Sequence, residues 1–298
     1  KFLGYNSREI CQKGNDLKND KFCLLRHGIN QPIQEKHQSF LACIAFLYDE
    51  KFFIEDIKEE LIKNLTLDKF ISVYNGTLVL TFEKEENYED KIDISKYSDN
   101  NIIKKLKEEK YLKKIILSYE NFIIYLRDKK TKINYEFLWD FICQPKSKNG
   151  LLFEKGINMF IFNSPSDDIT DKIELICPKT DYSTTLFDKS KDTVLLYSKN
   201  NYYEPLCQIK KIYGETKRIK TKTVKNKFFT MEKIRENTPE LLEILTLIIN
   251  ENLKYCLGET SISKHVYKFK KNKPLYKLIE LSTNKNYNID NQILNMNN

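Results

Sequence analysis

Residues that break regular structure are scarce in this 298-residue sequence, which has only eight glycines and seven prolines. That scarcity excludes a collagenous, linker-like or glycine-rich protein. No uncharged run reaches the roughly 18 residues of a membrane-spanning helix, so we expect no membrane association. The chain opens on Lys1 with no signal peptide, and we interpret it as a piece of something larger.

Closely spaced cysteine pairs are also absent. Seven cysteines are scattered along the chain without a CxxC motif, whereas a disulfide framework or a structural zinc site would need closer spacing. They are Cys11, Cys23, Cys43, Cys143, Cys177, Cys207 and Cys256. We therefore expect buried free thiols in a reducing compartment, with no metal and no other cofactor.

The motifs of several common enzyme classes are missing. None of GxGxxG, GxxxxGK(S/T), HExxH and GxSxG occurs, so the sequence gives no support for a dinucleotide, P-loop, zincin or α/β-hydrolase site. His27, His37 and His265 are the only histidines, so imidazole chemistry has few candidates.

What is present is enough apolar material, 41% of the residues, to bury one or two sizeable cores. Periodicity and capping residues predict helices over 39–48, 54–63, 67–74, 101–127 and 135–143, and one that opens at Thr238-Pro239-Glu240 and closes at Gly258. Short apolar runs between turn residues predict strands over 78–80, 158–162, 173–176, 193–197 and 202–206. Residues 1–36 are expected to be irregular. This order predicts an α+β fold that divides into 1–209 and an appendage over 210–298, a basic strand or hairpin followed by a helix.

The net charge of +8 is concentrated in residues 210–235, which hold ten basic residues against Glu215 and Glu232. The candidate binding residues are Lys217, Arg218, Lys220, Lys222, Lys225 and Lys227. Their near period-two spacing predicts a strand or ribbon with one basic face. Such a face could hold the phosphates of a nucleic acid, contact an acidic protein, or form an exposed hairpin.

Two separated segments resemble ovarian-tumour-type (OTU-like) cysteine proteases. The run Gln38-Ser39-Phe40-Leu41-Ala42-Cys43-Ile44-Ala45 resembles the start of the family's nucleophile helix, where the pattern is Asp-Gly-Asn-Cys followed by Leu-Phe-Arg-Ala-Ile. The run 193–197, a Lys-Asn loop and Tyr202-Tyr203-Glu204-Pro205-Leu206 resemble its final strands, whose pattern is His-Tyr-Glu-Pro-hydrophobic. The resemblance covers about residues 22–207 and implies papain-like helices packed on a small antiparallel sheet.

Both catalytic positions depart from the family pattern, because the cysteine maps to Ser39 and the histidine to Tyr202. The family's chemistry needs a thiolate made nucleophilic by an adjacent imidazole. A serine hydroxyl without a base is a poor nucleophile, and a tyrosine cannot replace an imidazole. The resemblance therefore implies a catalytically inactive fold. The residues retained from the pattern are expected to pack a central helix (Phe40, Leu41, Ile44 and Leu47) against a facing sheet (Leu195, Tyr197 and Leu206).

Several strings resemble segments of large proteins from nucleocytoplasmic large DNA viruses (giant viruses), related to the poxvirus early transcription factor large subunit. They are Leu-Leu-Arg-His-Gly-Ile-Asn (24–30), Gln-Ser-Phe-Leu-Ala-Cys-Ile-Ala (38–45), Leu-Trp-Asp-Phe-Ile-Cys-Gln-Pro (138–145), Asp-Asp-Ile-Thr-Asp-Lys-Ile-Glu-Leu-Ile-Cys-Pro (167–178) and Tyr-Tyr-Glu-Pro (202–205). This resemblance implies other viral proteins as partners and a place in the virion or in the host cytoplasm, at the virus factory.

These observations favour a non-catalytic protein-interaction or scaffold module of a virion or viral transcription assembly. One alternative is an active OTU-like cysteine protease or deubiquitinase that uses Cys43 or Cys23 with one of the three histidines. Another is a nucleic-acid-binding region of a transcription factor, which would use residues 210–235.

Overall fold

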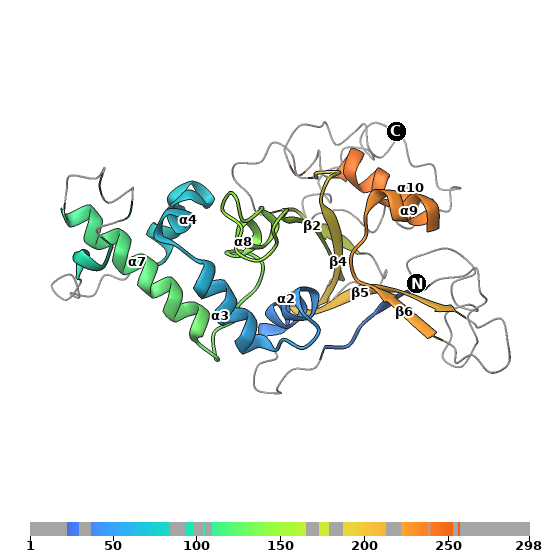
Figure 1. Ribbon diagram of the computed structural model, residues 1–298, viewed down its shortest axis with the longest axis horizontal. Helices are drawn as coiled ribbons and strands as arrows, with labels where there is room; N and C mark the ends of the chain where they lie inside the picture. The colour runs from blue at the N-terminus through green and yellow to red at the C-terminus, as the bar shows by residue number, and fades with distance from the viewer. Residues whose placement is uncertain are drawn as a thin grey trace, which may run out of the picture. The chain divides into compact units, whose positions relative to one another are not determined.

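Helices and strands occupy different parts of this chain in the computed structural model (Figure 1). The structure describes residues 23–29, 37–83, 93–97, 100, 104, 109–164, 173–178, 187–212, 222–237, 239–252 and 256. A helical unit comprises Asn30–Ile157 with Lys179–Ser183, and a sheet unit comprises Lys1–Ile29, Asn158–Pro178 and Thr184–Asn298. Several helices together with a small sheet give the α+β class that the sequence predicts.

The helical unit is built from short helices before one long one. They are α2 (Ser39–Tyr48), α3 (Ile54–Asn64), α4 (Leu67–Ser72), the 3-10 turn η2 (Tyr74–Gly76), α5 (Thr77–Thr81), the 3-10 turn η4 (Ile94–Tyr97), α7 (Glu109–Arg127) and α8 (Trp139–Cys143). The predicted helices over 39–48 and 54–63 are confirmed. Within the predicted 101–127 and 135–143 segments, the structure gives helices over Glu109–Arg127 and Trp139–Cys143.

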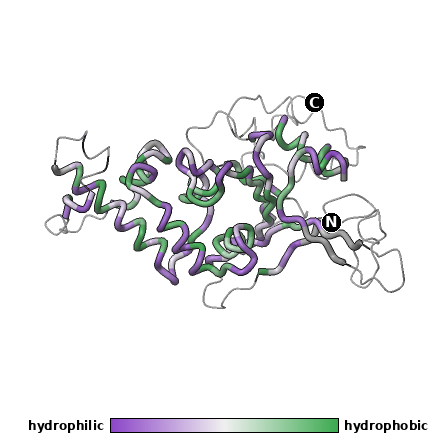
Figure 2. The backbone as a smooth tube through the Cα atoms, in the orientation of Figure 1, coloured by the Kyte–Doolittle hydropathy of each residue, from purple (hydrophilic) through white to green (hydrophobic). Residues whose placement is uncertain are grey.

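Helix α2 is apolar on every side, and its residues from Ser39 to Leu47 are all buried. A helix of that composition belongs in a core, whereas α3 has one apolar stripe and one charged face. Figure 2 shows this contrast between the hydrophobic α2 and the mixed α3. The start of α3 is fixed by Asp56, whose carboxylate accepts the Phe53 N–H at 2.8 Å.

The predicted strand over 78–80 is wrong, because these residues lie in helix α5. Gly76 adopts a left-handed conformation (φ 74°) and separates η2 from the new helix. Two side chains of α7 donate hydrogen bonds to α5 and the residue that follows it. The Ser118 hydroxyl donates to the Val79 carbonyl at 2.8 Å, and the Asn121 amide donates to the Phe82 carbonyl at 2.9 Å. Tertiary contacts therefore override the local strand preference of a short apolar run.

The sheet unit contains β1 (Cys23–Arg26), β2 (Ile157–Ser164), β3 (Glu174–Ile176), β4 (Asp192–Lys199), β5 (Tyr202–Ile212) and β6 (Lys222–Asn226). The strand order is β1-β5-β4-β2-β3, and β6 also pairs with β5. The four strands predicted over 158–206 are present. Strand β1 lies in the segment that the sequence indicated to be irregular, and its pairing with β5 is long-range.

The chain divides into compact units elsewhere than at the predicted boundary after residue 209, which falls inside β5. That strand runs without interruption from apolar Leu206 into Lys210 and Lys211, because its backbone pairs first with β4 and β1 and then with β6. The change in charge that suggested a boundary is therefore a change along one strand.

A two-residue turn joins β4 to β5. Asn200 and Asn201 both have positive φ angles, of 53° and 59°, and they link the paired residues Lys199 and Tyr202. Two left-handed residues in succession match the twist of a hairpin, and asparagine tolerates that conformation better than most residues. The turn thus aligns β4 with β5, the strand that carries the Tyr-Tyr-Glu-Pro motif.

One face of the sheet is covered by helices from the same unit, α9 (Met231–Asn237) and α10 (Pro239–Leu247), the latter continued by the π-helical turn η5 (Ile248–Asn252). Proline at the first position of α10 matches the predicted helix start. Leu195, Tyr197 and Leu206 lie in one buried apolar cluster with residues of both helices, so they pack against α9 and α10. The predicted packing of this sheet on the 39–48 helix stays a prediction.

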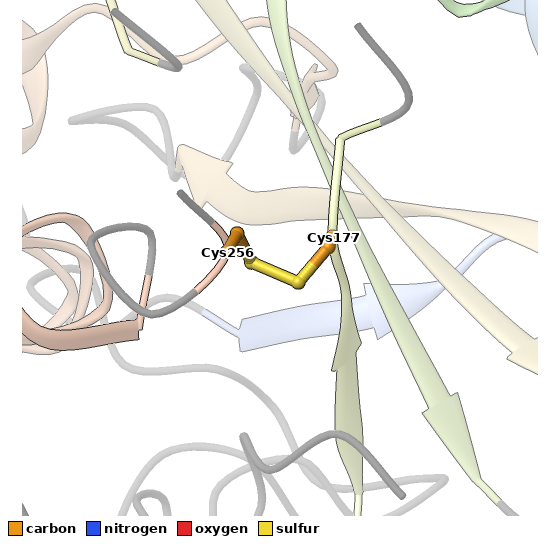
Figure 3. The surroundings of a disulfide bond; sticks show 2 residues. All are labelled: Cys177 and Cys256. Carbon is orange, nitrogen blue, oxygen red and sulfur yellow. A yellow bond between two sulfur atoms is a disulfide. The ribbon is translucent and has the colours of Figure 1, made fainter. Parts of the chain in front are cut away.

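A disulfide between Cys177 and Cys256 joins the residue after β3 to the C-terminal helical region (Figure 3). The two Cα atoms lie 5.4 Å apart although the cysteines are separated by 79 residues. This corrects the prediction that every thiol is free, because tertiary folding brings together cysteines that sequence spacing keeps apart. Cys43, Cys143 and Cys207 are buried thiols outside the disulfide, as predicted.

Candidate functional site

The Ser39 position lies at the first residue of α2 and has no exposed surface. The preceding residue, Gln38, is equally buried, and its side-chain amide donates to the carbonyls of Asp128 and Thr131 at 2.7 and 2.8 Å. His37 places its Nε2 atom 2.8 Å from the Lys129 carbonyl. The start of α2 is therefore anchored to the loop that follows α7.

That loop is itself ordered by local hydrogen bonds. The Asp128 carboxylate accepts the Thr131 hydroxyl and, at 2.8 Å, the Lys130 N–H. The hydrogen bond from the Thr131 hydroxyl is the main reason why the pKa of Asp128 lies below its ordinary value. The buried ammonium of Lys58 lies 3.3 Å from the Asp128 carbonyl and 3.8 Å from a Glu55 carboxylate oxygen. These contacts build a rigid support for α2 rather than an open site at its end.

The Tyr202 position is the first residue of β5, directly after the Asn200-Asn201 turn and opposite Lys199. Tyr202 is half-buried and belongs to the sheet unit, whereas Ser39 belongs to the helical unit. The following residues of the motif continue the strand, and Pro205 lies opposite Leu196. The Pro205 carbonyl accepts the His27 N–H at 2.9 Å, just beyond the last β1–β5 pair of Arg26 with Leu206, and proline has no N–H to return a bond there.

Of the two thiols proposed as nucleophiles for an active protease, Cys43 is not accessible. It has no exposed surface, and neither has Cys207, while Cys143 is 8% exposed. Cys43 lies inside α2, one turn after Ser39. Cys23 lies in strand β1, and His265 falls outside the described residues. A nucleophile must reach its substrate, so the buried thiols offer no catalytic surface.

The basic stretch is only partly described. Lys217, Arg218 and Lys220 lie outside the described residues, while β6 contains Lys222 and Lys225. In the β5–β6 ladder these two positions stand opposite Ile212 and Ile209. A ribbon is therefore present, and because positions an odd number apart in a strand lie on opposite faces, Lys222 and Lys225 are on different faces of it.

Lys227 follows β6, and its ammonium lies 5.9 Å from the centre of the Phe228 ring, within cation–π range. The next residue, Phe229, exchanges two backbone hydrogen bonds with Thr193 at 2.8 and 2.9 Å. The aromatic residues therefore connect the basic ribbon to β4 and to the core, where Phe229 is 3% exposed. They do not form a row of exposed rings on which bases could stack.

One polar cluster was not found from the sequence. Arg26 of β1 places its Nε atom 3.4 Å from a Glu204 carboxylate oxygen, and its guanidinium lies 5.0 Å from the centre of the Tyr197 ring. Register explains the cluster, because Arg26 pairs with Leu206 while Glu204 pairs with Tyr197. Its members come from three strands, and no local pattern in the sequence could have revealed it.

Within the described ranges, no group of three or more acidic, histidine or cysteine side chains could hold a metal ion. Among the same residues, no helix combines the length and apolar character that crossing a bilayer requires. Comparison with models of protein families, with curated proteins and with solved structures finds no significant match to this chain.

Proposed function

We propose that this chain is a non-catalytic protein-interaction or scaffold module with a degenerate OTU-like, papain-like design. The observation that carries the proposal is the burial of its candidate nucleophiles. Ser39 and Cys43 have no exposed surface, and the helix that bears them is buried from Ser39 to Leu47. Chemistry at this helix would require a substrate to reach atoms that the fold encloses.

Two further features support the same design. A wholly buried helix follows Gln38, as a central helix of the papain type would, and a tight hairpin carries the Tyr-Tyr-Glu-Pro motif. At the histidine position, Tyr202 supplies a phenol, which does not act as an imidazole base near neutral pH. The positions of the family's chemistry are then occupied by residues whose role is structural.

The partners that we propose are other proteins of a large DNA virus, in a virion or transcription assembly, within the host cytoplasm or the virion. The viral strings quoted above are the support for this origin. The surface that we propose for contact is the basic β5–β6 ribbon, because the described strands of that ribbon (208–212 and 222–226) contain four lysines and no acidic residue. A basic strand favours an acidic partner by charge complementarity.

The experiment that tests the absence of catalysis uses an electrophilic ubiquitin probe on the full chain. We expect no covalent adduct with the unmodified chain or with Ser39→Cys, because Tyr202 leaves that thiol without a base. The double variant Ser39→Cys with Tyr202→His supplies both groups of the family pattern, and we expect no more than a trace of adduct from it, because position 39 has no exposed surface. Adduct formation by the unmodified chain, abolished by Cys43→Ser, would overturn the proposal in favour of a thiol protease.

A further inference from the structure

We propose that the outer edge of strand β6 binds an extended acidic peptide as an additional antiparallel strand. This inference rests on the proposed interaction function and names the class of its partner. Its basis is the position of β6 in the ladder together with the charge of its sequence, Lys-Thr-Val-Lys-Asn over 222–226.

The ladder shows which edge of β6 is available. Gln208 of β5 is paired on one side with Leu24 of β1 and on the other with Asn226 of β6, and Ile209 is likewise shared between Cys23 and Lys225. Strands β1 and β6 therefore lie on opposite edges of β5. Among the described residues, β6 pairs only with β5, and no backbone hydrogen bond reaches its other edge.

An edge of this kind has backbone groups ready for another strand. In an antiparallel ladder, residues alternate between directing their N–H and C=O groups towards one neighbour and towards the other. Two or three of the five residues Lys222–Asn226 thus direct these groups outward. Peptides bind such edges by strand addition, with backbone hydrogen bonds supplying affinity.

The charge of the strand selects the occupant. Lysines on an edge strand prevent pairing with a like strand, because like charges opposite one another are destabilising. A second copy of β6 would bring Lys222 and Lys225 against lysines, so self-association through this edge is disfavoured. A strand with glutamates three positions apart would instead meet opposite charges at Lys222 and Lys225, one on each face, and β6 has no proline to interrupt the pairing.

The placement of the lysines on the ribbon favours an acidic peptide over a nucleic acid as the partner. Positions 222 and 225 fall on opposite faces of the ribbon, and the register pairs them with Ile212 and Ile209. A phosphate backbone is best held by cations gathered on one face, whereas an added strand lies in the plane of the sheet and presents residues to both faces.

The test measures the binding of a fluorescent peptide, Thr-Glu-Val-Thr-Glu-Val-Thr, whose glutamates have the same three-residue spacing as Lys222 and Lys225, to the full chain by anisotropy. We expect saturable binding, and binding at least about ten-fold weaker for the same peptide N-methylated at alternate residues, since methylation removes the donors of the ladder. Equal binding of the methylated peptide would mean attraction between charges alone and would overturn the proposal. No binding of either peptide to the full chain would overturn it as well.

Matched charge variants locate the site. Lys222→Glu with Lys225→Glu should weaken binding of the acidic peptide about ten-fold or more and create binding of Thr-Lys-Val-Thr-Lys-Val-Thr. The control Lys189→Glu with Lys199→Glu makes the same charge change at two exposed lysines away from β6 and should leave binding unchanged. An equal loss of peptide binding in the β6 variant and in the control variant would overturn the assignment. So would displacement of the labelled peptide by a duplex oligonucleotide at a lower concentration than the unlabelled peptide requires. Failure here leaves the ubiquitin-probe result intact, so the two proposals fail separately.

Discussion

In the helical unit, packing and side-chain hydrogen bonds join distant segments: α4 and α5 contact α7, and the Gln38 amide donates to the carbonyls of Asp128 and Thr131, 90 and 93 residues away. In the sheet unit, β5 pairs with β4 and β6, which precede and follow it in the chain, and with β1 near the start of the chain. A disulfide adds a covalent link across 79 residues in this unit. Distant contacts require long loops to be ordered, so a covalent link that closes a long loop should matter most where it is present.

The two units also bury different kinds of core. The helical unit packs rings of Phe70, Phe82, Phe122 and Phe141 against one another, with centroids 4.9–5.7 Å apart in the contacts they make with Phe122. The sheet unit covers one sheet face with α9 and α10 and fastens the region through Cys177 and Cys256. Packing alone should hold the first unit, and packing with a covalent link the second.

We expect the largest effect from a substitution that removes packing from the core of the helical unit. Leu41→Ala leaves a cavity in the centre of buried helix α2 and should lower the free energy of unfolding by about 2–5 kcal/mol. Fluorescence of Trp139, the only tryptophan and part of this unit, reports the unfolding in urea. The control Leu80→Ala, at a side chain that is 65% exposed, should unfold like the unmodified chain. Equal midpoints for both variants would place α2 at the surface.

Reduction of the Cys177–Cys256 disulfide should destabilise the sheet unit and leave the helical unit nearly unchanged. Removing a cross-link that closes a 79-residue separation should cost about 2–4 kcal/mol through the entropy of the unfolded chain. Hydrogen exchange of β4 and β5 amides, with and without a thiol reductant, measures the loss. Cys177→Ser with Cys256→Ser should match the reduced chain. Detection of seven free thiols in the unreduced chain would contradict the disulfide.

A smaller effect concerns the turn between β4 and β5. Asn201→Val puts a β-branched residue at φ 59° and should cost about 1–2 kcal/mol. Glycine accepts this conformation, so in the Asn201→Gly variant the hydrogen-exchange rates of the β4 and β5 amides should be close to those of the unmodified chain. Equal exchange rates for the valine and glycine variants would show that the turn does not hold the hairpin.

The smallest effect is electrostatic and belongs to the support of α2. The Thr131 hydroxyl lowers the pKa of Asp128, so the ionised carboxylate stabilises the fold at neutral pH. This contribution should be lost as the pH falls through the lowered pKa. Thr131→Val should therefore destabilise the helical unit at neutral pH, and the difference from the unmodified chain should shrink in acid. A difference that is constant with pH, measured by Trp139 fluorescence, would show that Asp128 ionisation plays no part.

Prediction from the sequence succeeded where the signal was local. The run Ser39–Tyr48 is apolar and bounded by polar residues, so a buried helix followed directly. The strands over 193–197 and 202–206 were recognisable from their apolar runs around the Lys-Asn loop. Strand β1 was missed because Cys23–Arg26 is short and becomes a strand through its pairing with β5.

The candidate site was predictable in composition but not in arrangement. The concentration of lysines in 210–235 is a property of the sequence, and a ribbon followed from their spacing. The partners of positions 222 and 225, Ile212 and Ile209, depend on how β6 aligns with β5. The enclosure of Ser39 likewise depends on residues that lie far away in the chain, including Asp128 and Thr131, which hold Gln38 beside it.

The sequence by itself determined the apolar character of α2, the start of α10 at Pro239 and the position of the positive charge, because each depends on residues that are adjacent in the chain. Only the tertiary structure decided the strand neighbours, the Cys177–Cys256 link and the close approach at Gly156, where an added Cβ would lie 2.3 Å from the Cys143 carbonyl oxygen. The physical reason is range. Helix periodicity and capping act within a few residues, whereas pairing, cross-linking and close packing join segments that meet only after the chain has folded.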